Sequence, residues 1–127
     1  MNKYHNRKVI TSDGIEHDSQ KEARRWCELL LLQRAGKIQD LERQVKFVLI
    51  PAQYEVYERY SKKGERLKDG QKCIEKECIY VADFVYTLDG NKIVEDVKGY
   101  KDGGAYRIFS IKRKLMLYIH HIRVKEV

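Results

Sequence analysis

Residues 80–98 carry the side chains whose types and spacing best suit chemistry. Asp83 lies in one apolar segment, Asp96 and Lys98 lie in the next, and Asp89-Gly90 separates the two segments. An Asp-Gly pair between two apolar runs is the strongest short-range signal for a β-hairpin. A two-residue turn at this pair places Asp83 opposite Asp96, with Lys98 two residues further along the same face.

This register divides the hairpin into two faces. Opposed residues share a face, with Cβ atoms about 4.5–5.5 Å apart. One face carries Asp83, Asp96 and Lys98 among valines, and the other carries Phe84, Tyr86, Ile93, Glu95 and Val97. Glu95 is therefore expected to point away from the two aspartates.

Two opposed carboxylates repel each other, and a divalent cation removes the repulsion. Mg²⁺ is a hard ion that binds one or two carboxylates together with water and substrate phosphate. The hairpin therefore predicts a metal site at Asp83 and Asp96, with Lys98 placed to orient water or to neutralise charge on a phosphate. The alternative is that all three are solvated charges on an exposed sheet face.

The elements around this hairpin follow from apolar periodicity and turn residues. Residues 8–17 predict a short hairpin about Asp13-Gly14, and Ser19 and Gly36 bracket a helix over 20–35. Residues 44–59 predict strand broken near Pro51, residues 61–72 an exposed basic loop or arm, and residues 77–86 and 91–98 two strands. A second helix follows, with Ile108, Ile111, Leu115, Tyr118 and Ile119 as its apolar stripe, and the chain ends in a short strand.

The expected order is hairpin–α–β–β–β–α–β. It predicts one α/β domain over residues 1–127, with a central mixed sheet flanked by helices. A length of 127 residues fits a single domain that can bury its own core. No apolar run is long enough to span a bilayer. Three cysteines without a secretion signal predict free thiols in the cytoplasm.

The charge balance predicts a polyanionic partner. The chain has 26 basic and 19 acidic residues, a net charge of +7, and nucleic acid is the simplest partner for such a domain. Three basic groups adjoin the hairpin in sequence and are the candidate DNA contacts: Lys62, Lys63, Arg66 and Lys68; Lys101; and Arg107, Lys112, Arg113 and Lys114. A charged run is also what an ordinary solvated face looks like.

The ordered set of Asp83 and then Asp96-Val97-Lys98 resembles the PD-(D/E)XK nuclease motif. The phrases S-x-x-E at Ser19, DLERQVKF with Gln44, ADF and EDVKG are similar, in the same order, to those of small phage-encoded proteins. That family is similar to RecU-type Holliday-junction resolvases and to the endonuclease subunit of heteromeric transposases. The resemblance covers about residues 8–126, and one departure from it is Ala82 where the motif has proline.

The resemblance implies a restriction-endonuclease-like fold and Mg²⁺- or Mn²⁺-dependent hydrolysis of DNA phosphodiesters, with branched DNA as the expected substrate. By motif position, Asp83 and Asp96 would be metal ligands, Lys98 the catalytic lysine, and Glu22 a further acidic ligand. Gln44 would be a secondary site residue. Cleavage of a four-way junction at two symmetric positions would require a homodimer.

Alternatives remain for these residues and for the whole protein. Glu22 also completes the pattern of a capping box with Ser19, and Gln44 is a common polar residue of a sheet edge. The fold could serve as a non-catalytic nucleic-acid-binding module, since fold does not imply function. The protein could also be a nuclease subunit that is active only within a larger recombination or replication complex.

Overall fold

The structure, a computed structural model, describes residues 7–99 and 101–127 as an α/β protein with a mixed sheet and two helices. The elements are β1 (Val9–Ile10), β2 (Glu16–His17), α1 (Gln20–Arg34), β3 (Gln39–Ile50), β4 (Gln53–Tyr60), β5 (Arg66–Glu75), β6 (Cys78–Leu88), β7 (Asn91–Asp96), α2 (Gly104–Leu115), η1 (Met116–His120), a π-helical turn, and β8 (Lys125–Glu126). Neither helix is long and apolar enough, within these described residues, to cross a lipid bilayer.

The predicted turn at Asp89-Gly90 is confirmed. β6 and β7 pair antiparallel from Leu88 opposite Asn91 to Phe84 opposite Glu95. Asp89 and Gly90 have φ values of 50° and 79°, which a two-residue hairpin turn of the primed type requires. This turn therefore fixes which residues of β6 and β7 share a face.

The first helix begins and ends close to its predicted limits. Ser19 Oγ accepts a hydrogen bond from the Glu22 amide at 3.1 Å, as an N-cap does. Gly36 follows the helix with a φ of 74°, a conformation that glycine adopts without strain. α1 buries Ala23, Trp26 and Leu29, whereas Cys27 and Leu31 face outward.

The central sheet has four strands in the order β3-β6-β7-β8, with β8 parallel to β7 and the other pairs antiparallel. A hydrophobic core lies on each face. Trp26 and Leu29 of α1 pack with Phe84 and Tyr86 on one face. Phe109 and Met116, from α2 and η1, pack with residues such as Val85 on the other. The two helices therefore cover opposite faces of the sheet.

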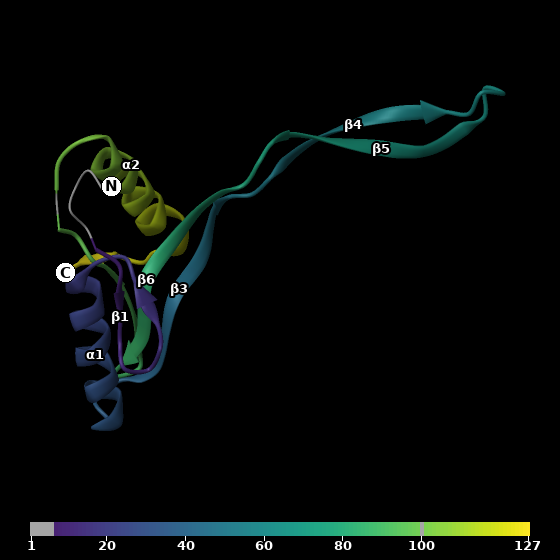
Figure 1. Ribbon diagram of the computed structural model, residues 1–127. Coiled ribbons are helices and arrows are strands. Elements are labelled where there is room, and N and C mark those ends of the chain that lie inside the picture. Colours follow the sequence, from purple (N-terminus) through teal and green to yellow (C-terminus); the bar gives the residue numbers. More distant parts are fainter. Residues whose placement is uncertain (1–6, 100) are drawn as a thin grey trace.

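Residues 61–72, predicted to be an exposed basic loop or arm, are largely exposed but are not a loop: they form the turn and most of the second strand of a β-hairpin. β4 and β5 pair antiparallel as a sheet of their own, joined by a turn at residues 61–65. We call residues 53–75 the arm, because this hairpin projects far from the rest of the molecule (Figure 1). Pro51 separates it from β3, as predicted, since proline interrupts strand pairing. Five strands rather than three therefore separate the two helices.

The prediction that the apolar stripe of the second helix packs in the core was wrong. Phe109 and Met116 are the residues that α2 and η1 bury. Ile108 and Ile111 are each 59% exposed and Tyr118 is 81% exposed. Periodicity identified a helix with an apolar stripe, but it could not show which side of that helix meets the sheet.

Glu95 is fully buried beneath α1, on the side of β7 that the hairpin register predicted. Arg25 donates to both of its carboxylate oxygens, at 2.8 and 2.6 Å, and the Tyr86 hydroxyl donates to one of them. Burial alone would raise the pKa of Glu95, but the hydrogen bonds from Arg25 and Tyr86 outweigh it and hold that pKa below its usual value. The ion pair therefore ties α1 to β7.

Removing the cation of this pair should destabilise the fold strongly. Arg25→Met leaves a buried carboxylate without its partner, which typically costs about 3–5 kcal/mol. We expect a loss of this size in the free energy of unfolding, measured by urea titration at neutral pH. Removing both charges in Arg25→Met/Glu95→Leu should recover most of the loss, since no charge then remains buried.

Lys46→Met is the matched control, because Lys46 and Glu77 form an ion pair at 2.8 Å whose side chains are about half exposed. Exposed pairs contribute about 0–1 kcal/mol. A loss in Arg25→Met no larger than in this control would contradict the structural role of the pair.

Candidate active site

Asp83, Asp96 and Lys98 meet where β6 and β7 emerge from their regular pairing. Lys98 Nζ lies 2.8 Å from Asp96 Oδ1, and the Tyr80 hydroxyl donates to Asp96 Oδ2 at 2.6 Å. The Val97 amide donates to Asp83 Oδ2 at 2.7 Å. Asp83 thus contacts the strand of Asp96 through its side chain, just beyond the last ladder pair at Phe84 and Glu95.

The Lys98 ammonium is held from two sides. Besides the Asp96 carboxylate, the ring of Phe109 lies beneath it, with the nitrogen 3.7 Å from the ring centroid. Such a cation–π contact adds about 0.5–2 kcal/mol, more where water is excluded. Only 19% of the Lys98 side chain is exposed. The sheet and α2 therefore fix the position of this cation together.

Along β6, the regular alternation of side chains between the two faces of the sheet is interrupted at Asp83. Tyr80 and Ala82 pack in the core beneath α2, whereas Phe84 packs in the core beneath α1. The facing position on β3 is Gln44, which lies between the pairs Arg43–Phe84 and Val45–Ala82 and has a φ of 54°. A positive φ is uncommon for glutamine. It marks a local irregularity of the sheet beside the site, which strict period-two reasoning could not show.

Gln44 itself is exposed. No side-chain hydrogen bond joins it to Asp83 or Asp96 in the described part of the chain. Gln44 therefore lies on β3 opposite Asp83, but its side chain makes no contact among the described residues that would identify it as a ligand.

Glu22 comes from α1 and is buried, with 5% of its surface exposed. Its carboxylate lies 3.9 Å from Nδ1 of the fully buried His17. In residues 7–99 and 101–127 the Ser19 amide makes no hydrogen bond to Glu22, so only half of the capping box forms. Burial, above all, raises the pKa of Glu22, and the negative charges of Asp18 and Asp96 add to the effect. The carboxylate of Glu22 thus lies within electrostatic reach of the aspartates.

Asp83 is the carboxylate whose ionisation is most strongly opposed. Burial, and more weakly the charges of Asp96 and Glu22, raises its pKa to about 7, against the opposing effects of the Val97 amide and Lys98. Asp96 of β7 therefore lies near enough to Asp83 of β6 and to Glu22 of α1 for its charge to raise the pKa of both.

The chemistry of these donors fits a hard divalent cation. Carboxylate oxygens are the ligands that Mg²⁺ and Mn²⁺ prefer, and one or two protein carboxylates suffice for Mg²⁺. No three His, Cys, Asp or Glu side chains converge closely enough to form a cage within the part of the chain that the structure describes. A cation here would be held by Asp83 and Asp96, with Glu22 as the nearest further carboxylate and water for the remainder.

The sequence did not single out two neighbours of the carboxylates, Tyr80 and His17. Tyr80 reads as an ordinary strand tyrosine, but a buried hydroxyl needs a partner, and here the partner is Asp96. Nδ1 of His17 is buried and has no hydrogen-bond partner among the residues that the structure describes, and Nε2 lies 3.4 Å from Thr11 Oγ1. Burial lowers the pKa of His17, an effect to which the charge of Arg43 adds.

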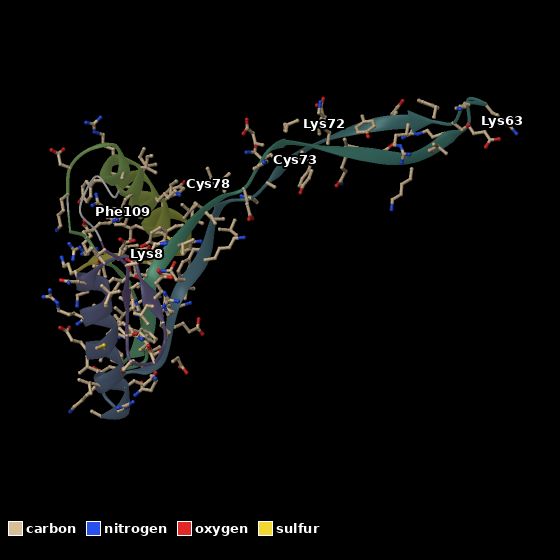
Figure 2. All side chains as sticks on the ribbon, in the orientation of Figure 1. Lys8, Lys63, Lys72, Cys73, Cys78 and Phe109 are labelled. Carbon is tan, nitrogen blue, oxygen red and sulfur yellow. The ribbon has the colours of Figure 1, made fainter. Side chains whose placement is uncertain are left out.

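The predicted basic groups lie at different places. Lys62, Lys63, Arg66 and Lys68 belong to the outer arm, where Arg66 pairs with Glu58 and Asp69. Figure 2 shows Lys63 at the far tip of the arm and Phe109, which contacts Lys98, in the body. Lys101 follows β7, and Arg107, Lys112, Arg113 and Lys114 lie on α2, where Arg113 pairs with Glu126 at 3.2 Å. The outer arm is thus separated from the carboxylates, whereas α2 adjoins them.

A further basic group, which sequence reasoning missed, surrounds a pocket beside β7. The pocket has a volume of about 350 Å³ and is lined by Lys21, Arg24, Arg25, Glu28, Val97, Lys125 and Val127. Lys21 Nζ also donates to the Lys98 carbonyl at 2.5 Å. Only the fold brings cations of α1 together with Lys125 of β8 next to the residue that precedes Lys98.

Asp83 gives the metal-free protein a specific dependence of stability on pH. Its pKa is about 7 in the folded chain and 3.8 in an unperturbed aspartate. Between these values the folded state keeps a proton that the unfolded state has lost, so stability falls as pH rises and then levels off above about pH 7. Asp83→Asn should remove this fall and gain about 2–4 kcal/mol relative to the wild type at about pH 8.

Urea unfolding in the presence of a chelator, from about pH 4 to 8, measures the effect. Asp89→Asn in the exposed turn should keep the wild-type profile, since asparagine tolerates positive φ. Parallel profiles for the wild type and Asp83→Asn would contradict the burial of this carboxyl.

Similarity to known proteins shows the family of the chain. No curated protein matches the sequence, and no solved structure matches it. The family described as "Protein of unknown function (DUF1064)" matches residues 1–126, nearly the whole chain. The protein therefore belongs to the DUF1064 family.

Proposed function

We propose that this protein is a metal-dependent DNA endonuclease whose active site consists of Asp83, Asp96, Lys98 and Glu22. The observation that carries the proposal is a pair of acidic side chains, the partly buried Asp83 and the buried Asp96, beside one fixed ammonium, with the buried Glu22 within electrostatic reach of both. Burial, and to a lesser extent the charge of Asp96, raises the pKa values of Asp83 and Glu22, while Lys98 Nζ is held 2.8 Å from Asp96. A purely structural acid pair would be expected to be fully matched by cations, as Glu95 is by Arg25.

Asp83 and Asp96 would hold a Mg²⁺ or Mn²⁺ ion, with Glu22 contributing directly or through water. When bound, the cation supplies Lewis-acid activation of water and of the scissile phosphate. The Tyr80 hydroxyl orients the Asp96 carboxylate through its 2.6 Å hydrogen bond. The Val97 amide does the same for Asp83. Both contacts leave carboxylate lone pairs free for a ligand.

Lys98 would act on the phosphate. Its ammonium is a compact cation with three donors, and the Phe109 ring and the Asp96 carboxylate fix its place. A preorganised cation aimed at developing negative charge is among the largest single contributions to catalysis. As a phosphate approaches, the Lys98 ammonium would either leave the Asp96 carboxylate or bind the carboxylate and the phosphate together.

The proposed substrate is branched DNA, such as a four-way junction, acted on in the cytoplasm of a host cell by a phage-encoded homodimer. The net charge of +7 supports a DNA partner. Cations that adjoin Val97 and Lys98 support backbone contacts at the site itself. A restriction-endonuclease-like core is consistent with the mixed sheet and its two flanking helices.

The central prediction concerns cleavage. With Mg²⁺ or Mn²⁺, the purified protein should cut four-way junctions or flaps in a gel assay over a panel of branched, nicked and linear DNA. Asp83→Asn, Asp96→Asn and Lys98→Met should each lower the cleavage rate at least about 100-fold, the typical loss when a preorganised charge is removed.

Asp89→Asn is the matched control, because this aspartate lies in the same hairpin but in its exposed turn. It should cleave like the wild type. If the wild type binds DNA tightly but cleaves none of the substrates with either metal, the proposal is contradicted and a binding module is favoured. Restoration of cleavage by recombination or replication proteins would instead identify a subunit of a larger nuclease.

A second prediction concerns which cations contact DNA. Arg24→Ala/Lys125→Ala should weaken binding and lower the slope of log affinity against log salt by about 2, because two phosphate contacts are lost. Lys62→Ala/Lys63→Ala removes the same charge at the far tip of the arm and should change the slope less. Fluorescence anisotropy with a junction at several salt concentrations, in Ca²⁺, measures both. Equal slopes for the two double variants would contradict this assignment.

A further inference from the structure

The arm exposes apolar side chains that residues 7–99 and 101–127 leave uncovered. A two-stranded hairpin is only marginally stable in water by itself. Tyr54 and Val56, near the root of the arm, are 56% and 59% exposed. They share one face of the hairpin, with Cys73 and Gln71 opposite them. A face of this kind on a projecting element is expected to pack against something.

On the other face of the arm root, a side chain of one strand packs against the backbone of the other. The Tyr57 ring lies directly over Gly70, so closely that a Cβ at Gly70 would come within 2.3 Å of the ring. Gly70 is accordingly the one buried residue of β5. Tyr54 and Val56 are each more than half exposed, so they form the open side of the root.

A second uncovered apolar surface lies on the helix that follows β7. Ile108, Ile111, Tyr118 and Ile119 recur at helical spacing, and all are exposed, Tyr118 by 81%. We call these four residues the α2–η1 stripe. The sheet-facing residues of these elements are Phe109 and Met116, so the stripe points away from the core.

The two surfaces are complementary in charge. The root of the arm, residues 53–58 and 71–75, has one lysine and three glutamates, a net charge of −2. Residues 104–119 of the helix contain Arg107, Lys112, Arg113 and Lys114 and no acidic residue. An apolar face on an acidic background thus matches an apolar stripe on a basic one, as electrostatically complementary interfaces do.

The arm cannot cover the stripe of its own chain. The ring of His120 lies 2.7 Å from the Val48 carbonyl oxygen through Nε2, which places η1 beside the end of β3 where the arm begins. From there the arm runs outward, away from α2 (Figures 1 and 2). Among the residues that the structure describes, the stripe and the arm root therefore have no partner within one copy.

We propose that the root of the arm docks on the α2–η1 stripe of a second copy of this chain, and reciprocally. A two-fold axis then forms two identical arm-to-stripe contacts and closes the assembly as a dimer. The basic tip of the arm lies beyond the contact. The proposal does not depend on nuclease activity, since it follows from surfaces outside the carboxylate site.

Sedimentation equilibrium over a range of protein concentrations tests the dimer. The wild type should be dimeric at micromolar concentration. Val56→Lys places a cation against the basic stripe, and Ile111→Asp places an anion against the acidic root, so each should raise the dimer dissociation constant at least about 30-fold. Both positions are exposed, and circular dichroism should show an unchanged fold. Ile10→Lys, an exposed aliphatic residue of β1, should remain dimeric.

Mixing the two variants separates this arrangement from any other. A mixed dimer of Val56→Lys with Ile111→Asp has one wild-type contact and one contact in which the new lysine faces the new aspartate. The mixture should therefore dimerise at least about 10-fold more tightly than either variant alone. A monomeric wild type, variants that dimerise like the wild type, or a mixture no tighter than its components would each overturn the proposal.

Discussion

Two adjacent carboxylates on β7, Glu95 and Asp96, are both buried and point to opposite faces of the sheet, so the structure must supply positive charge on each side. Toward α1, Arg25 donates two hydrogen bonds to Glu95. Toward α2, Lys98 pairs with Asp96 above the Phe109 ring. Because a buried charge without a partner is costly, these contacts determine where both helices sit against the sheet. The hairpin β6–β7 is thus the element on which the rest of the body is assembled.

The carboxylates on the two sides of β7 differ in how completely cations and hydrogen-bond donors neutralise them. This difference distinguishes a structural ion pair from a candidate functional site. Glu95 has a bidentate arginine and a tyrosine hydroxyl, and its pKa is lowered despite its burial. On the other side, the Lys98 ammonium and the Tyr80 hydroxyl contact Asp96, and the pKa of the neighbouring Asp83 is raised to about 7. Perturbed ionisation of this kind is typical of functional sites. The proposed divalent cation would neutralise Asp83 and Asp96 together, whereas the Lys98 ammonium pairs with Asp96.

The arm and the body of the molecule carry different kinds of surface. The body holds the buried carboxylates and the cations next to them, whereas the arm carries exposed apolar residues at its root and basic residues at its tip. Its strands pair only with each other, so neither core of the body stabilises it. A long element of this kind is consistent with a role in holding a partner. It leaves the carboxylate region open for other contacts.

The sequence by itself determined the local features. The Asp89-Gly90 turn, the register of β6 and β7, the cap of α1 at Ser19, the break at Pro51 and the opposite orientation of Glu95 all follow from short-range chemistry and period-two alternation. Tertiary structure decided the rest. It set which side of α2 meets the sheet, made residues 66–75 the second strand of a projecting hairpin, and changed the phase of β6 beside Gln44. It also brought Tyr80 to Asp96, His17 to Glu22, and Glu22 within electrostatic reach of the aspartates. These outcomes depend on packing between segments far apart in the chain, and a pattern read along one segment cannot contain them.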